Sequence, residues 1–106
     1  MHLLTRSEEL LLLTVWHLQD KAYGAAIRER LSQKTGKDWA IGSVYIPLDR
    51  LAKKGLLSTH IGTPTRERGG RSTRCYKLTG QGVKALNYTK SVMDVFWQDS
   101  KQIAPI

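Results

Sequence analysis

The sequence predicts a mostly helical α+β fold in which three short helices and a β-hairpin are followed by one long C-terminal helix. Apolar residues recur at helical spacing in several segments. Two runs with strand-like alternation flank a Gly- and Arg-rich connection between residues 62 and 72. A helix that ends at Gly55 and continues directly into a basic hairpin is the outline of a winged helix-turn-helix.

Positive charge is concentrated in one stretch of the chain. The 106 residues carry a net charge of +8, and residues 42–77 hold eight Lys and Arg minus two Asp and Glu, which gives +6. Such local basicity favours a polyanionic partner, either nucleic acid or an anionic membrane surface. The length fits a single domain with a modest core.

Composition also argues against several classes of protein. The apolar-rich run from Leu10 to Leu18 is shorter than the ~20 residues of a membrane span, and it follows Glu8 and Glu9, which is the wrong charge for a signal peptide. We therefore expect a cytoplasmic protein without a membrane span, and the leading interpretation includes no membrane partner. The single cysteine, Cys75, and the scattered histidines predict no disulfide, metal or cofactor. Without a paired acid and base or a phosphate loop, no enzyme is expected.

The first two helices have clear local signals. Thr5-Arg6-Ser7-Glu8 fits a capping box, so helix 1 should begin near residue 6. Its run from residue 10 to 18 is apolar almost all round and needs cover on more than one side. Trp16 and His17 are interpreted as a core tryptophan and a half-buried histidine. A second helix should open at Tyr23-Gly24 and end before Gly36.

The third helix should bury Val44, Leu48 and Leu51, with Trp39 in the core just before it. The opposite face then carries the candidate DNA-reading residues Ser43, Ile46, Pro47 and Arg50. A proline beyond the first turn costs ~3 kcal/mol, because its missing N–H removes a helical hydrogen bond. We therefore expect the helix to start later than Ser43 or to be bent.

The two strands of the hairpin should run over residues 57–61 and 74–78, with Tyr76 and Leu78 pointing inward. The connection between them is long and contains Pro64 and two glycines, so it should form a wing tip. Planar guanidinium groups suit phosphate and groove contacts, whereas the alternative is a solvated run of charge. The arginines of this predicted wing are Arg66, Arg68, Arg71 and Arg74.

Thr79 should cap a last helix that runs to about Ser100. At ~100° per residue its apolar side chains cover an arc of roughly 200°, whereas a helix on one small domain needs a stripe of only about 100° or somewhat more. We infer a homodimer in which this helix and helix 1 meet a second copy of the chain. The expected interface residues are Leu13, Trp16, Val92, Met93, Phe96 and Trp97.

An ordered set of short motifs carries a family resemblance. The chain resembles PadR-like transcriptional regulators over about residues 5 to 90, through Tyr23-Gly24, Gly42-Ser43-Val44-Tyr45, Leu48-Asp49-Arg50-Leu51, Lys54-Gly55-Leu56, Gly69-Gly70-Arg71, Tyr76-Lys77-Leu78-Thr79 and Gly82. The resemblance implies a winged-helix repressor that dimerises through a C-terminal helix packed with the first helix. It also implies that Ser43 and Tyr45 lie at the DNA-facing start of the recognition helix and that Arg71 lies in the wing. Ile46 stands where members often have proline.

Some PadR-like proteins bind flat apolar effectors between paired C-terminal helices, with a tryptophan from each subunit against the ligand. The resemblance would give that role to Trp97, although the ring in those members stands one turn earlier, where this chain has Met93. Two interpretations of the apolar seam between the helices remain open. It is either dimer core or a site for a small apolar aromatic effector.

Together these observations predict a division of the chain into a DNA-binding domain (1–78), a dimerisation helix (79–100) and a frayed tail (101–106). The expected function is sequence-specific binding of double-stranded DNA by a homodimer that represses transcription. The alternative is an interaction module that docks on a protein or an anionic membrane surface through the same basic hairpin.

Overall fold

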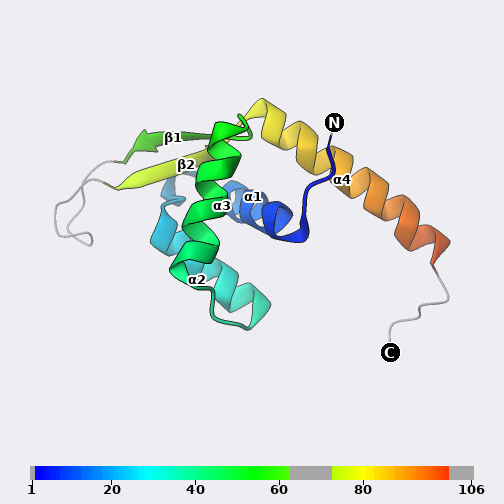
Figure 1. Ribbon diagram of the computed structural model, residues 1–106, viewed down its shortest axis with the longest axis horizontal. Helices are drawn as coiled ribbons and strands as arrows, with labels where there is room; N and C mark the ends of the chain where they lie inside the picture. The colour runs from blue at the N-terminus through cyan, green and yellow to red at the C-terminus, as the bar shows by residue number, and fades with distance from the viewer. Residues whose placement is uncertain (1, 63–72, 101–106) are drawn as a thin grey trace.

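The computed structural model describes residues 2–62 and 73–100 (Figure 1). The chain forms a mostly helical α+β fold, as predicted, and a single 3₁₀ turn (Gln19–Lys21) separates the first two helices. Its elements in order are α1 (Arg6–Leu18), α2 (Gly24–Thr35), α3 (Ile41–Lys53), β1 (Leu57–Ile61), β2 (Arg74–Leu78) and α4 (Gly80–Asp99). No helix in the described part of the chain is long and apolar enough to cross a membrane.

The predicted ends of α1, α2 and α4 are confirmed. In the capping box of α1, Thr5 Oγ1 accepts a hydrogen bond from Glu8 N (3.1 Å), and Glu8 Oε1 accepts one from Thr5 N (2.9 Å). The second helix ends at Thr35, and the glycine that follows, Gly36, has a left-handed φ of 73°. Thr79 caps α4 by accepting from Gly82 N at 3.0 Å. These contacts satisfy amides that a helix start leaves without an internal partner.

The start of α3 differs from the expectation. The helix begins at Ile41, before Ser43, and Pro47 lies inside it. The proline costs ~3 kcal/mol, but Val44, Leu48 and Leu51 are fully buried on the inner face. Each such side chain contributes ~1.5–3 kcal/mol by leaving water. Packing on both sides of the proline therefore outweighs the missing hydrogen bond, and a later start is wrong.

The core lies where the first three helices meet the base of the hairpin, and it contains Leu11, Leu12, Val15, Ile27 and Leu31. Trp39 is buried as predicted, with its Nε1 donating to Thr35 Oγ1 at 2.8 Å.

Trp16 does not belong to this core. Trp16 is 56% exposed, and His17 is exposed as well. The buried side of α1 consists of Leu11, Leu12, Thr14 and Val15, so Trp16 lies on the outer flank of the helix. The interpretation of Trp16 as a core residue is therefore wrong.

Strands β1 and β2 pair antiparallel from Leu57 opposite Leu78 to Ile61 opposite Arg74. The backbone at Ala22 runs along the outer edge of β2, where Ala22 O accepts from Tyr76 N at 2.8 Å. Cys75 and Tyr76 are both buried. Because neighbouring residues of a strand point to opposite faces, both faces of β2 are covered at this point. In β1 only Leu57 is buried, so the apolar and polar alternation of its sequence is not matched by alternating burial.

The long helix α4 packs on the domain through its first half only. A Cβ on Gly82 would lie 2.3 Å from Leu56 O, so the absence of a side chain permits this close approach. Further along, Thr89 is buried and its Oγ1 accepts from Leu4 N at 3.1 Å. Beyond that hydrogen bond the helix extends past the other elements, and Phe96 and Trp97 are 64% and 59% exposed (Figure 1).

Candidate nucleic-acid interface

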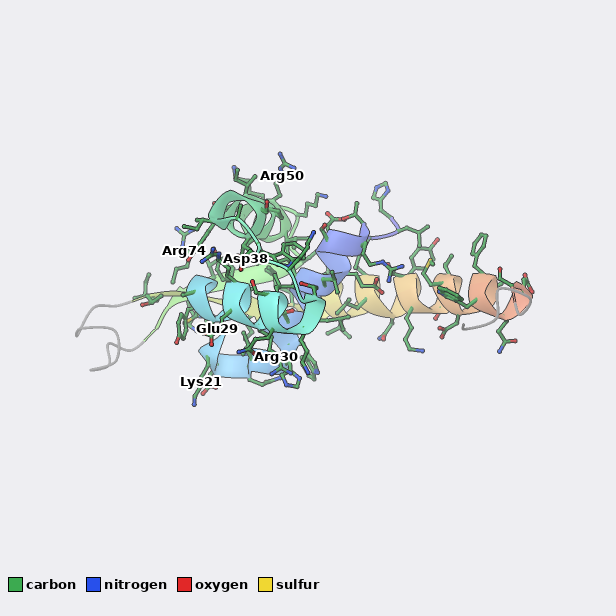
Figure 2. The ribbon with its side chains drawn as sticks, turned by 90° about the horizontal axis from the view of Figure 1, so that it is seen from below. Lys21, Glu29, Arg30, Asp38, Arg50 and Arg74 are labelled. Atoms are coloured by element: carbon green, nitrogen blue, oxygen red, sulfur yellow. The ribbon has the colours of Figure 1, made fainter. Side chains whose placement is uncertain are left out.

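The outer face of α3 is the first candidate surface. Ser43, Ile46 and Arg50 are exposed there, opposite the buried stripe of the helix. Figure 2 shows Arg50 projecting from α3 away from the rest of the domain, whereas Lys21 points from the opposite side of the molecule. The exposed Lys53 belongs to the same face of α3. Sequence reasoning missed Lys53, although a spacing of 100° per residue places it close to Ile46 around the helix.

Tyr45 does not share this orientation. A Cβ on Gly24 would lie 2.2 Å from Tyr45 Oη and 2.3 Å from Tyr45 Cζ, so the tyrosine ring packs directly over Gly24 at the start of α2. Tyr45 as a residue is 37% exposed, so it remains accessible only in part. The structure thereby joins two motifs that are separate in sequence, and Tyr45 anchors α3 to α2.

Arg74 lies on the α3 side of the hairpin (Figure 2). Its Nη1 is 3.4 Å from Asp49 Oδ1, which links β2 to the middle of α3. Burial raises the pKa of the neighbouring Tyr76 hydroxyl, and a hydrogen bond from Arg74 offsets part of that rise. Because both members of the ion pair are more than half exposed, the pair adds at most ~1 kcal/mol to stability. Its effect is to hold Arg74 beside the outer face of α3. The other predicted wing residues, Arg66, Arg68 and Arg71, lie outside the described residues.

Of the three cations at and near the end of α3 (Arg50, Lys53 and Lys54), one is held in an ion pair. Lys54 Nζ is 3.0 Å from Glu8 Oε2, which ties the end of α3 to α1. Burial acts to raise the pKa of Glu8, but the hydrogen bonds from Thr5 and Lys54 lower it overall. Within residues 2–62 and 73–100, Arg50 and Lys53 have no acidic partner. Their positive charge is therefore available to a polyanion.

The residues predicted for the dimer interface fall on two separate surfaces. Leu13 and Trp16 line a groove of about 500 Å³ between α1 and the first half of α4, together with Leu78, Val83 and Leu86. Val92, Met93, Phe96 and Trp97 belong to the second half of α4. Met93, Phe96 and Trp97 border a shallow hollow of about 120 Å³ with Ser100. Sequence reasoning missed Val83 and Leu86, because they form a groove only together with α1, which is distant from them in the chain.

Comparison with known proteins agrees with this architecture. The family model of the transcriptional regulator PadR-like family matches residues 12–88. Among curated proteins no relative is found.

Solved structures include RosR of H. salinarum, with 29% identity over 97% of this chain and 81% of that chain and a TM-score of 0.62. A PadR-like transcription factor of Bacteroides fragilis has 25% identity, covers 93% of each chain and has a TM-score of 0.70. A PadR family transcription regulator of Clostridium difficile R20291 has 20% identity over 95% of this chain and 100% of that chain, with a TM-score of 0.73, and shares the fold.

The family match covers most of the chain, including α2, α3, the hairpin and the first half of α4. The order of the elements and the exposed basic face of α3 are those of a winged-helix DNA-binding protein. The chain belongs to the PadR-like family of transcriptional regulators, which are DNA-binding proteins and not enzymes.

Proposed function

We propose that this protein binds double-stranded DNA sequence-specifically as a homodimer and represses transcription. Residues 1–78 form the DNA-binding domain of this proposal and residues 79–100 the dimerisation helix. The observation that carries it is the outer face of α3, where Arg50 and Lys53 are exposed without an acidic partner among the described residues. An α-helix fits the major groove, and arginine is the side chain that most often reads guanine there.

The position of Arg74 favours DNA over a protein or membrane partner. A module that docked through its hairpin alone would not require a cation on α3 in line with the wing. Here the ion pair with Asp49 holds Arg74 beside the face that carries Arg50 (Figure 2). A duplex offers phosphates on both sides of the major groove, so α3 in the groove and the wing on the adjacent backbone could be engaged together.

A second copy of the chain would account for both apolar surfaces of α4. In a two-fold dimer each contact occurs twice, so the far half of α4 from one copy could fill the groove beside Leu13 and Trp16 of the other. Phe96 and Trp97 are large aromatic side chains of the kind that anchor interfaces. Their exposure in a single chain supports the homodimer.

The first test is selection of an operator from random duplexes, followed by binding measurements at several salt concentrations. Arg50→Ala should relax the preference at one base pair per half-site, by ~1–3 kcal/mol. Affinity falls with salt, and the slope of log affinity against log salt concentration reports the number of neutralised phosphates. Replacing the wing arginines 66, 68, 71 and 74 with Ala should reduce the magnitude of this slope by about 1 for each phosphate contact that is lost.

Lys21→Ala is the matched control, because Lys21 points from the opposite side of the molecule (Figure 2). Half-sites should lie about one helical turn apart, roughly 34 Å. Inserting half a turn, about five base pairs, should therefore abolish tight binding. Binding to duplexes that shows no base preference and survives all these replacements would contradict the proposal and favour an interaction module.

A small aromatic effector is part of this proposal, and its site would have to be formed by two copies of the chain together. The hollow beside Trp97 measures about 120 Å³ in one chain, whereas ligand pockets hold ~300–1,000 Å³. Planar aromatic compounds should then quench the tryptophan emission of the dimer. A wild-type emission that is indifferent to a broad panel of such compounds would leave the seam as dimer core.

A further inference from the structure

The outer face of α3 carries an apolar side chain at its centre. Ile46 is 55% exposed there, and it is flanked one turn later by Asp49 and Arg50. One turn earlier stands Gly42, and a Cβ on that residue would lie 3.8 Å from Ile46 Cδ1. The isoleucine therefore extends along a stretch of helix that has no side chain of its own to cover it.

This exposure is not explained by folding or by the proposed dimer. The core side of α3 is formed by Val44, Leu48 and Leu51, and the apolar surfaces of the dimer proposal lie on α1 and α4. A single exposed isoleucine is ordinary on a protein surface. On the face of α3 that is proposed to meet DNA, however, Ile46 would be matched best by an apolar group of the partner in the same place.

The major groove offers one such partner. Each base pair presents a distinct set of donors and acceptors there, and thymine alone among the four bases adds a methyl group, at C5. A branched side chain on the centre line of a helix in the groove would meet this methyl group directly.

We propose that Ile46 is a specificity-determining residue that recognises the 5-methyl group of a thymine in each half-site. The inference rests on the proposed DNA-binding function and adds the chemistry of one base position to it. Ile46 and Arg50 are four residues apart, which corresponds to about 6 Å along a helix at 1.5 Å per residue. The thymine should therefore lie about two base pairs from the base that Arg50 reads, at 3.4 Å per base pair.

The test removes only the methyl group. In the selected operator each thymine is replaced singly by deoxyuridine, and affinities are measured by fluorescence anisotropy. Burial of one methyl group is worth ~0.8 kcal/mol, so the wild-type protein should lose about fourfold in affinity at one position per half-site. Replacing that thymine by 5-methylcytosine, paired with guanine, should cost less than replacing it by cytosine.

Ile46→Ala should bind the thymine and deoxyuridine operators equally. Ile41→Ala is the matched control, because Ile41 is an exposed isoleucine of the same helix but lies on its flank; this variant should keep the fourfold difference. Circular dichroism should show both variants folded, since both side chains are mostly outside the core.

The inference and the proposed function fail in different ways. If wild-type protein binds a selected operator with Arg50-dependent preference, and deoxyuridine is neutral at every thymine, the methyl contact is wrong and the DNA-binding function stands. If Ile41→Ala rather than Ile46→Ala removes the methyl dependence, the assignment to Ile46 is overturned. If no operator is selected and binding shows no base preference, both fall together.

Discussion

Replacing Gly24 with alanine should destabilise the protein through a single contact, the one with the ring of Tyr45. The new Cβ would lie 2.2 Å from Tyr45 Oη and 2.3 Å from Tyr45 Cε1 and Cζ. Real carbon atoms do not approach this closely, so either the ring must swing into solvent or α3 must move away from α2. Overpacking of this kind costs ~1–3 kcal/mol, against a gain of up to ~1 kcal/mol from replacing a helical glycine. We expect a net loss of about 1–2 kcal/mol.

Urea denaturation measures this loss, and the chain supplies a matched control. Gly24 and Gly80 are both the first residue of a helix, at α2 and α4. A Cβ on Gly80 would meet no described atom within 4 Å, so Gly80→Ala should be neutral or slightly stabilising. A similar loss in both variants would mean that the effect comes from the backbone and not from the ring.

A double replacement isolates the ring itself. In the background of Tyr45→Ala the obstruction is absent, so Gly24→Ala should cost much less there than in the wild type. The difference is the coupling energy of the pair, which reaches ~0.5–3 kcal/mol for residues that touch. Because Tyr45 anchors α3, the helix proposed to contact DNA, to α2, Gly24→Ala should also weaken DNA binding at urea concentrations where the variant is still folded. A coupling energy of zero would refute the packing of Tyr45 on Gly24.

The remaining predictions concern pH and assembly. The pKa of Glu8 is lowered on folding from 4.5, despite its burial, because Thr5 and Lys54 stabilise the carboxylate. Its contribution to stability should therefore be present above pH ~4.5 and be lost as the pH falls through the folded value. The stability difference between wild type and Glu8→Gln, followed by urea denaturation from pH 7 to pH 3, should shrink towards acid. A constant difference would contradict the lowered pKa of Glu8. Phe96→Asp should raise the dimer dissociation constant by at least about 100-fold, equivalent to ~3 kcal/mol, in sedimentation equilibrium, whereas Gln98→Asp on the polar side of α4 should leave it unchanged. A wild-type protein that stays monomeric at high concentration would exclude the homodimer.

Local signals in the sequence determined where the elements begin and what each one buries. Thr5 and Glu8 close a capping box within one turn, and at α4 the Thr79 side chain alone caps the helix by accepting from Gly82 N. Val44, Leu48 and Leu51 mark the inner face of α3 through spacing alone. These predictions succeeded because each depends on groups only a few residues apart. Even so, the start of α3 was misjudged, because the cost of Pro47 was weighed without the burial on both sides of it.

The relative placement of the elements was decided only by the tertiary structure. Trp16 lies outside the core because the flank of α1 that carries Leu11, Leu12 and Val15 is the buried one. Tyr45 turns towards Gly24, and Arg74 pairs with Asp49, through interactions between residues that are distant in the chain. Periodicity identifies a face of a helix, but it contains no information about which neighbour covers the flanks of that face. The neighbours of each flank are determined by the close approach of α2, α3 and the hairpin. For this reason Tyr45 packs on α2, whereas Ile46, the next residue, faces outward.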